Sequence, residues 1–412
     1  MNASLEDYRN VVGPEVVDEL TQLAERVGHR RLVHVNSTAV GGGVAELLTR
    51  LVPLLQELGI DTSWEIIKGD RAFFAVTKAL HNALHGATEE ITQKMFDVYR
   101  ETIDVNLRDL GPMDDFVVIH DPQPAGLVAR KAQSGGHWLW RCHLDVSTPN
   151  PRAWAFLKPY IEQYDGSIFS TAEFSQALGV PQFLIPPSID PLSDKNRELT
   201  VDDTRTVLEK HGIDPKRPIL TQVSRFDRLK DPLGVMEAYR LVRRRYDCQL
   251  VLAGGGAADD PEGAQVLAEV REAAGNNPDI HILSLPPFSD LEINALVRGS
   301  TIVMQKSLKE GFGLTVTEAL WKRRPVIGSA VGGIKQQVIN GVTGFLVHSP
   351  EGAANRAIEL LSDESLRHTI GDNGHQHVRE NFLTTRHLRD YLLLMLAMDH
   401  RESDITMLTG SR

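Results

Sequence analysis

The chain has 412 residues, 42% hydrophobic and 24% charged, and a formal net charge of −11. Its length exceeds what one hydrophobic core usually supports, so we expect two domains. The acidic balance disfavours nucleic acid and anionic membranes as partners.

The two cysteines, Cys142 and Cys248, each lie inside an apolar run, so neither a disulfide framework nor a zinc cluster is indicated. The first eighteen residues show no signal-like apolar stretch. The longest apolar run, near residues 391–398, is too short to cross a bilayer. These features predict a cytoplasmic protein.

Short apolar, β-branched runs alternate with helix-like segments and are typical of buried parallel strands. In the first part of the chain they are residues 32–35, 64–67, 116–119, 138–142, 167–169 and 182–185. The pattern restarts after a polar stretch at 191–203, with residues 219–223, 249–253, 280–283, 302–304, 326–327 and 345–347. Two such series predict an α/β fold with Rossmann-like domains over residues 1–195 and 196–383.

Helices are expected between these strands, and residues 44–58 give the clearest one. Pro53 lies inside it and predicts a kink, and Gly59 predicts its end. From about residue 351 onward the pattern is helical only. We expect the last helix, within residues 384–412, to pack back on the first domain.

The sharpest motif is residues 309–319, a strand end followed by a glycine-flanked turn and a helix start. Gly311 and Gly313 allow the backbone to approach a ligand closely. The free N–H groups of Leu314 and Thr315 at the helix N-terminus would face an anion such as a diphosphate.

The same motif carries two acidic residues, Glu310 and Glu318. In the turn, Glu310 can reach sugar hydroxyls. Glu318 could accept hydrogen bonds from a ribose diol, as acidic residues do in dinucleotide sites. The alternative interpretation makes Glu318 a first-turn helix acid and Glu310 a solvated loop charge.

A second motif, residues 224–230, follows the first strand of the second domain, where open α/β sheets bind ligands. Arg225 and Lys230 would neutralise negative charge on a departing diphosphate. The alternative is a basic loop that forms surface ion pairs with Asp227 and Asp231.

A third motif, Gly41-Gly42-Gly43, lies at the first strand-to-helix turn. Its backbone amides could cradle a phosphate or a sugar, although a tight turn without a ligand is an equal alternative. Glu46 occupies the place of the third glycine of the dinucleotide fingerprint, which weakens an NAD site.

Polar groups also follow two strands of the first domain: His120 and Asp121 after one, and Arg141, His143 and Asp145 after the next. They could bind the hydroxyls of an acceptor. Histidine and aspartate at strand ends are also common turn formers and helix caps, so that alternative stays open.

A metal site is not expected. His81 and His85 have the spacing of two ligands on one helical face, but no third ligand is evident, and the sequence contains no Asp-X-Asp triplet. A Walker loop and a Gly-X-Ser-X-Gly elbow are also missing, so an ATPase and a hydrolase triad are not supported.

The glycine-rich first turn, Arg225 with Lys230, and Glu310 with Glu318 together resemble retaining glycosyltransferases of the GT-B fold in the glycogen-synthase-like and sucrose-synthase-like group. Segments 34–46, 120–124, 138–143 and 224–227 are similar to the trehalose glycosyltransferring synthase family. The resemblance implies two Rossmann-like domains facing each other across a cleft. It also implies a reversible reaction of nucleoside-diphosphate-glucose (NDP-glucose) with glucose to give α,α-trehalose, with the anomeric configuration kept.

The resemblance further implies residue roles. Glu310 would hold hydroxyls of the donor glucose, Glu318 the ribose, and Arg225 with Lys230 the diphosphate, while His143 would lie by the transferred glucose. The predicted sites are therefore catalytic Glu310, Arg225, Lys230 and His143; donor-binding Gly42, Gly43, Gly311, Phe312, Gly313, Leu314, Thr315 and Glu318; and acceptor-binding Asp121, Arg141 and Asp145. No metal or other cofactor is expected to be required. Many family members have Gly after the lysine, where Asp231 stands here.

Alternatives remain at this stage. A trehalose phosphorylase would share the architecture and use inorganic phosphate, and a non-catalytic sugar-nucleotide sensor would share the binding motifs. The apolar terminal helices could cover the protein's own domains or a twin subunit, so a homodimer is a further alternative. The nucleotide base carries no signature in the sequence.

Overall fold

The computed structural model describes residues 4–39, 43–88, 90–111, 113, 115–255 and 261–400. The chain divides into two compact units. Unit 1 comprises Met1–Ser188 together with Thr384–Arg412, and unit 2 comprises Ile189–Leu383. The boundary predicted from the sequence was after residue 195.

Unit 1 is built on a parallel sheet with the strand order β2-β1-β3-β4-β5-β6. Its strands are β1 (Arg31–Asn36), β2 (Asp61–Ile66), β3 (Phe116–His120), β4 (His137–Arg141), β5 (Gly166–Phe169) and β6 (Gln182–Leu184). In the register of the central strands, Leu32 pairs with Phe116 and Val117 with Trp138. Because β1 and β3 are neighbours but not consecutive, the strand order reverses between them, and such switch points are where open sheets bind ligands.

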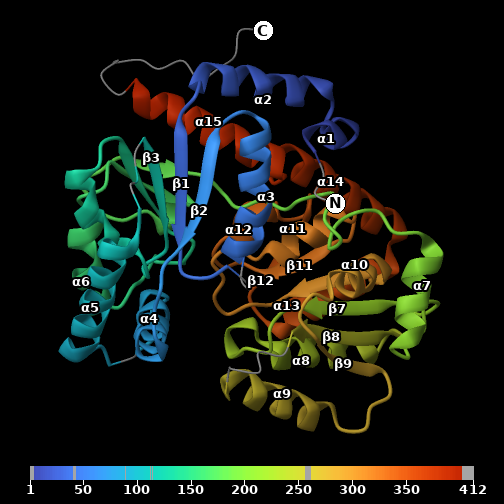
Figure 1. Cartoon of the computed structure of the whole chain (residues 1–412). Coiled ribbons are helices and arrows are strands. Elements are labelled where there is room, and N and C mark those ends of the chain that lie inside the picture. The colour runs from blue at the N-terminus through green and yellow to red at the C-terminus, as the bar shows by residue number, and fades with distance from the viewer. Residues whose placement is uncertain are drawn as a thin grey trace. The chain divides into compact units, whose positions relative to one another are not determined.

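Helices cover both faces of this sheet (Figure 1). Helices α4 (Arg71–Leu84), α5 (Gln93–Asp109) and α6 (Pro151–Ile161) cover one face. On the other lie α2 (Pro14–Val27), α3 (Gly43–Glu57) and α15 (Thr384–Asp399), with α1 (Leu5–Val12) beside α2. Two short 3-10 helices, η1 (Ala125–Gln133) and η2 (Ala172–Phe174), follow β3 and β5. The last helix therefore packs within unit 1, against α2 and α3.

Local sequence signals explain where these helices begin. Asp70 caps α4, its Oδ1 accepting the Phe73 amide at 2.8 Å, and Asn150 caps α6 ahead of Pro151. Both caps satisfy amides that have no partner inside the helix. Helix α3 continues through Pro53 as one helix.

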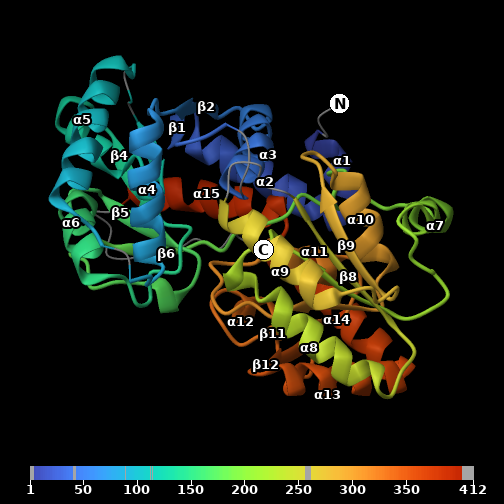
Figure 2. The ribbon, with the colours of Figure 1, turned by 90° about the horizontal axis from the view of Figure 1, so that it is seen from below.

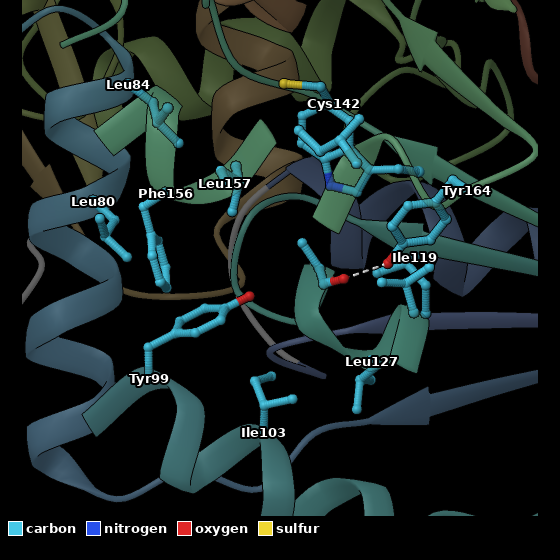
Figure 3. Packing of buried hydrophobic residues seen from close by; sticks show 14 of the residues in the cluster. Leu80, Leu84, Tyr99, Ile103, Ile119, Leu127, Cys142, Phe156, Leu157 and Tyr164 are labelled. Atoms are coloured by element: carbon cyan, nitrogen blue, oxygen red, sulfur yellow. Dashed lines mark hydrogen bonds between the residues drawn. The ribbon is translucent and has the colours of Figure 1, made fainter. Parts of the chain in front are cut away.

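Aromatic side chains fill the core between the sheet and α4, α5 and α6 (Figure 3). Phe96 and Phe156 stack with their ring centroids 3.9 Å apart. The Tyr99 hydroxyl donates to Pro122 O at 2.8 Å, and the Tyr164 hydroxyl donates to Ala125 O at 2.6 Å. These buried hydroxyls hold the segment after β3, because a buried polar group is stable only when it is hydrogen-bonded.

Unit 2 repeats the architecture with the strand order β12-β11-β10-β7-β8-β9. Its strands are β7 (Ile219–Val223), β8 (Gln249–Gly255), β9 (Ile280–Leu285), β10 (Ile302–Gln305), β11 (Val326–Ser329) and β12 (Gly344–Val347). All neighbouring pairs are parallel. The strand order reverses between β7 and β10, which gives this unit its own switch point.

The helices of unit 2 also form two layers (Figures 1 and 2). One layer contains α8 (Pro232–Arg243), α9 (Pro261–Ala274) and α13 (Pro350–Ser362). The other contains α7 (Val201–Lys210), α10 (Asp290–Gly299), α11 (Leu314–Trp321) and α14 (Glu364–Asn381). The short helices η3 (Arg228–Lys230) and α12 (Ile334–Gln337) follow β7 and β11.

Each of the twelve strands expected from the sequence falls on one of these twelve strands, and the two-unit α/β fold is confirmed. The buried runs of β-branched residues made this prediction possible, since strands covered on both faces are apolar throughout. In the part of the chain that the structure describes, no helix is long and apolar enough to span a membrane.

Gly254 marks a close approach between two strand ends of unit 2. A Cβ placed on it would lie 1.8 Å from Ser224 O, whereas a Cβ on the adjacent Gly255 would find only Leu285 O, at 4.0 Å. We expect Gly254→Ala to lower the free energy of unfolding by about 1–3 kcal/mol, because Ser224 must move. The control Gly255→Ala should stay within about 0.5 kcal/mol of the parent. Urea unfolding checks both, and equal midpoints for the two variants would contradict the close approach.

Candidate functional site

The carboxyl ends of β7 and β10 meet at the switch point of unit 2. The segment 224–231 follows β7, and the segment 306–313 follows β10. The Leu308 amide donates to Leu229 O at 2.7 Å and ties the two segments together. The second motif and the 309–319 motif, which are far apart in the sequence, therefore meet at one edge of the sheet.

Glu310 is held at this edge by three donors that gather on its Oε2. Lys230 Nζ lies at 2.6 Å, Ser307 Oγ at 3.0 Å and Gln305 Nε2 at 3.5 Å. Glu310 is only 7% exposed, so it is not a solvated loop charge. A carboxylate at this depth needs a cation and hydrogen-bond donors, and both are supplied here.

Lys230 is fixed by the loop that carries it. Gln222 Nε2 donates to Lys230 O at 2.7 Å. The next residue, Asp231, has a φ of 48° and caps α8 through Oδ1, which accepts the Gly234 amide at 3.1 Å. Its Oδ2 pairs with Lys306. The acidic group beside Lys230 thus has its own cation.

Arg225 is placed differently from Lys230. Its side chain is 66% exposed, and its Nη2 lies 3.4 Å from Asp227 Oδ2. Such an exposed pair contributes little, so the guanidinium is available to a ligand at the end of β7. Asp227 also caps η3, its Oδ1 accepting the Leu229 amide at 2.7 Å.

The glycine turn leads into α11. Gly313 is the N-cap with a φ of 85°, a conformation that favours glycine, and α11 begins at Leu314. The amides of Leu314 and Thr315 therefore lie in its first turn, as expected. The connection after β11 packs on this turn, since a Cβ on Gly332 would lie 1.7 Å from Glu310 O.

The other backbone oxygens of the turn also have partners. Gly333 N donates to Gly311 O at 3.3 Å, and Gln337 Nε2 donates to Phe312 O at 2.6 Å. The Phe312 ring is buried and lies 5.7 Å from that of Phe382. The predicted donor segment is thus a rigid turn, because its carbonyls are bonded and its aromatic ring is anchored.

Glu318 lies within α11 and is 2% exposed, so it is not a solvent-facing first-turn acid. Its Oε1 lies 3.5 Å from Lys195 Nζ. Lys322 Nζ donates to Glu318 O at 3.2 Å and to Asn196 Oδ1 at 2.7 Å, and burial lowers the pKa of Lys322 to about 7. Glu310 and Glu318 therefore pair with different lysines.

In unit 1, three histidines form a chain of ring contacts near the carboxyl edge. His34 Nδ1 lies 3.0 Å from His120 Nε2, and His120 Nδ1 lies 3.0 Å from His143 Nε2. His34 and His120 are buried, whereas His143 is partly exposed. Burial lowers the pKa of His34 to about 3 and holds the pKa of His120 and of His143 well below the usual value. All three rings are neutral at pH 7.

Arg141 contacts the last of these three histidines from the interior of unit 1. Its Nε donates to His143 Nε2 at 3.2 Å, its Nη1 to Tyr391 Oη at 3.3 Å and its Nη2 to Ile185 O at 3.0 Å. With the residue 1% exposed, its guanidinium is occupied by the protein. Arg141 is the last residue of β4, at the carboxyl edge where it was predicted, but its side chain is buried rather than open to an acceptor.

The two predicted acceptor aspartates hold the segment after the strands. Asp121 has a φ of 66°, and its Oδ1 accepts the His143 amide at 2.8 Å. Burial raises the pKa of Asp121 to about 7. Asp145 Oδ1 accepts from Ser147 N at 3.0 Å and from Ser147 Oγ at 2.5 Å. Both fix the backbone that carries His143.

Part of the third motif lies outside the described residues, including Gly41 and the predicted donor-binding Gly42. Gly43 is described as the first, exposed residue of α3. The rings of His81 and His85 have centroids 4.9 Å apart. Across the described ranges, no group of three His, Cys, Asp or Glu side chains is placed to hold a metal ion.

Several residues that support the site were not predicted from the sequence. They are Lys195, Gln222, Gln305, Lys306, Ser307, Gly332, Gln337 and Tyr391. Most act through contacts between segments distant in sequence, which no local pattern records. One available signal was the Gly332-Gly333 pair, which lies a few residues after the strand predicted at 326–327.

Family models match both units. The model described as "Trehalose synthase, N-terminal domain" matches residues 34–176, and "Glycosyl transferases group 1" matches residues 203–377. The trehalose synthase of Thermococcus litoralis is 44% identical over 399 residues, covering 95% of this chain and 96% of that protein. That of Rubrobacter xylanophilus is 44% identical over 403 residues, with the same coverage. The trehalose phosphorylase of Pleurotus pulmonarius is 28% identical, with 97% of this chain matching 61% of that protein.

Solved structures show the same fold. The sucrose-phosphate synthase of Thermosynechococcus elongatus has a TM-score of 0.68 at 20% identity, covering 91% of this chain and 99% of that one. An α,α-trehalose 6-phosphate synthase from Burkholderia multivorans has a TM-score of 0.70 at 15% identity, covering 91% and 100%. These likenesses, with two parallel six-stranded sheets, confirm the GT-B fold class. Because trehalose synthases match it at 44% identity over nearly their full length, the chain belongs to the trehalose synthase family of glycosyltransferases.

Proposed function

We propose that this glycosyltransferase forms α,α-trehalose from NDP-glucose and free glucose, reversibly and with retention of the anomeric configuration. The observation that carries the proposal is the partly buried Lys230–Glu310 pair, 2.6 Å apart, at the switch point of unit 2. A cation and a carboxylate fixed side by side suit a ligand that carries a diphosphate next to sugar hydroxyls.

Each residue of the proposed donor site binds a different part of NDP-glucose. Arg225 and Lys230 neutralise the diphosphate, and the amides at the start of α11 add the positive end of a helix dipole. Glu310 binds hydroxyls of the donor glucose, and Glu318 binds the ribose. In this scheme protein groups supply all the positive charge that the leaving group needs, so no divalent cation is required.

The chemical step is a same-face substitution. The bond from the anomeric carbon to the phosphate oxygen breaks, and a bond to the acceptor oxygen forms on the same face. The acceptor's proton passes to the departing phosphate oxygen, so no protein base is required. A two-carboxylate covalent route, as in retaining hydrolases, stays the alternative.

Residues of unit 1 serve the sugars in this proposal. His143 lies by the transferred glucose, and Asp121 and Asp145 remain proposed for the acceptor. The role of Arg141 is revised. Because its guanidinium is buried and hydrogen-bonded within unit 1, we propose that Arg141 acts through His143. The phosphorylase alternative rests on the more distant relative and would replace the nucleotide with phosphate.

Trehalose breakdown separates the two reactions. We expect the enzyme with trehalose and each nucleoside diphosphate to release glucose and form a sugar nucleotide, at an unchanged rate when EDTA is present. Chromatography of the products identifies the nucleotide base as well. Release of glucose 1-phosphate with inorganic phosphate alone would instead establish the phosphorylase.

Glu310→Gln tests the carboxylate while keeping its size. We expect kcat to fall about 10²–10³-fold, because the charge that binds and orients the donor sugar is lost. Glu269→Gln is the matched control, since Glu269 also pairs with a cation, that of Arg228, at 2.7 Å but on the surface. The control should keep the parental rate and melting temperature. Glu310→Gln should have a lower melting temperature, because Lys230 loses its counter-ion, so its rate is measured at a temperature where circular dichroism shows the variant to be folded. Near-normal turnover of Glu310→Gln would remove Glu310 from the site.

Arg225→Ala tests the exposed cation. Because Arg225 is largely solvent-exposed, the variant should remain as stable as the parent while kcat/KM for NDP-glucose falls about tenfold or more. Arg228→Ala, three residues away, removes a surface arginine that pairs with Glu269 and should leave kcat/KM unchanged. Equal effects of the two substitutions would point to general surface charge rather than to binding of the diphosphate by Arg225.

A further inference from the structure

The contact between Arg141 and His143 decides which nitrogen of His143 carries a proton. An arginine side chain stays protonated in proteins and its Nε always carries a hydrogen. Arg141 Nε points that hydrogen at His143 Nε2, 3.2 Å away. His143 Nε2 must therefore be the unprotonated nitrogen that accepts, which leaves the hydrogen of the neutral ring on Nδ1.

This assignment extends to the next two rings. His143 Nε2 also lies 3.0 Å from His120 Nδ1. Because His143 Nε2 carries no hydrogen, this contact is a hydrogen bond only if His120 Nδ1 donates. The single lone pair of His143 Nε2 is then shared by the Arg141 and His120 donors, and His120 Nε2 in turn accepts. His34 Nδ1, 3.0 Å from His120 Nε2, is then the donor of the last contact. All three rings carry their hydrogen on Nδ1.

The opposite set of tautomers, with each hydrogen on Nε2, is unfavourable at both ends of the row of three histidines. It would set a His143 Nε2–H against the Arg141 Nε–H. It would also place a hydrogen on His34 Nε2, which is buried and has no hydrogen-bond partner among the residues that the structure describes. Orphaned buried donors are rare, whereas an unpaired acceptor is more readily tolerated.

We propose that Arg141 is a positioning residue that sets the tautomer of His143, and through it those of His120 and His34, so that His143 offers a neutral Nδ1–H donor to a sugar hydroxyl. The identity of the sugar in this proposal rests on the proposed function. The assignment of the tautomers does not. His143 is the only partly exposed member of the chain His34–His120–His143, so it is the ring that a ligand can reach. A donor that cannot act as a base suits a reaction in which the leaving phosphate takes the acceptor's proton.

The surroundings of His143 also keep it neutral. The titratable groups around it are His34 on β1, His120 and Asp121 at the end of β3, Cys142 and Asp145 on its own segment, and His387, Tyr391 and Arg386 on α15. Burial lowers the pKa of His143 most, and the Arg141 charge lowers it further. Removing Arg141 therefore raises the pKa of His143, so the variant gains a proton on this ring as pH falls.

Nitrogen-15 NMR of the full chain labelled at histidine measures the tautomers directly, without any activity. The His143 signals are assigned by their loss in His143→Gln. In the parent we expect a protonated Nδ1 and a bare Nε2 on His143 from pH 5 to pH 8. An Nε2–H tautomer in the parent overturns the proposal, and this result needs no variant to fold.

Arg141→Met removes the donor but keeps an unbranched side chain of similar length. We expect His143 in this variant to populate Nε2–H and its pKa to rise, and kcat/KM to fall about 10–100-fold. Tyr391→Phe is the control, because it removes another Arg141 contact and leaves the one to His143. It should keep the parental tautomer. An unchanged tautomer and an unchanged pKa of His143 in Arg141→Met would contradict the role of Arg141.

The two proposals can fail separately. If the parent shows the expected tautomers but forms no trehalose or sugar nucleotide, only the proposed function is wrong. If trehalose forms and the parent shows Nε2–H on His143, only the tautomer assignment is wrong.

Discussion

The ion pair between Lys230 and Glu310 is the contact on which the edge of unit 2 depends. It joins the loops after β7 and β10, which are neighbours in the sheet although about eighty residues separate them in the chain. A carboxylate at this depth without a cation would be strongly destabilising, so the two loops must close on each other. The close approaches at Gly254 and Gly332 allow the backbone to do so.

The two units have the same kind of sheet but carry different polar groups at their switch points. Each sheet is parallel and has a switch point, between β1 and β3 in unit 1 and between β7 and β10 in unit 2. At the second point the polar groups are charged and paired. At the first they are neutral histidines whose hydrogens are ordered by one buried arginine. Charge therefore gathers where a diphosphate is proposed to bind, and uncharged donors gather where the proposal places sugar hydroxyls.

The sequence predicted the strands and placed Lys230 and Glu310 in segments that follow strands, because each of these depends on a local pattern: apolar runs, glycine turns and strand ends. It did not predict that Arg141 is buried. The hydrogen bond of Arg141 to Tyr391 spans 250 residues in sequence, and only the return of α15 to unit 1 creates it. Asp231 shows the same limit, since nothing local indicates that Lys306 neutralises it. The positive φ of Asp231 is a conformation that favours glycine, which is the residue that the resemblance leads one to expect there.

Glu310 is held by a second set of donors that does not depend on Lys230. If the lysine turns toward a bound diphosphate, Ser307 Oγ and Gln305 Nε2 still donate to the carboxylate, and Gln305 Nε2 also donates to Ser307 Oγ at 3.1 Å. Because these neutral donors come from β10 and its own loop, they move with Glu310. Under the proposed function, these neutral donors keep the carboxylate oriented toward the sugar while Lys230 also contacts the diphosphate.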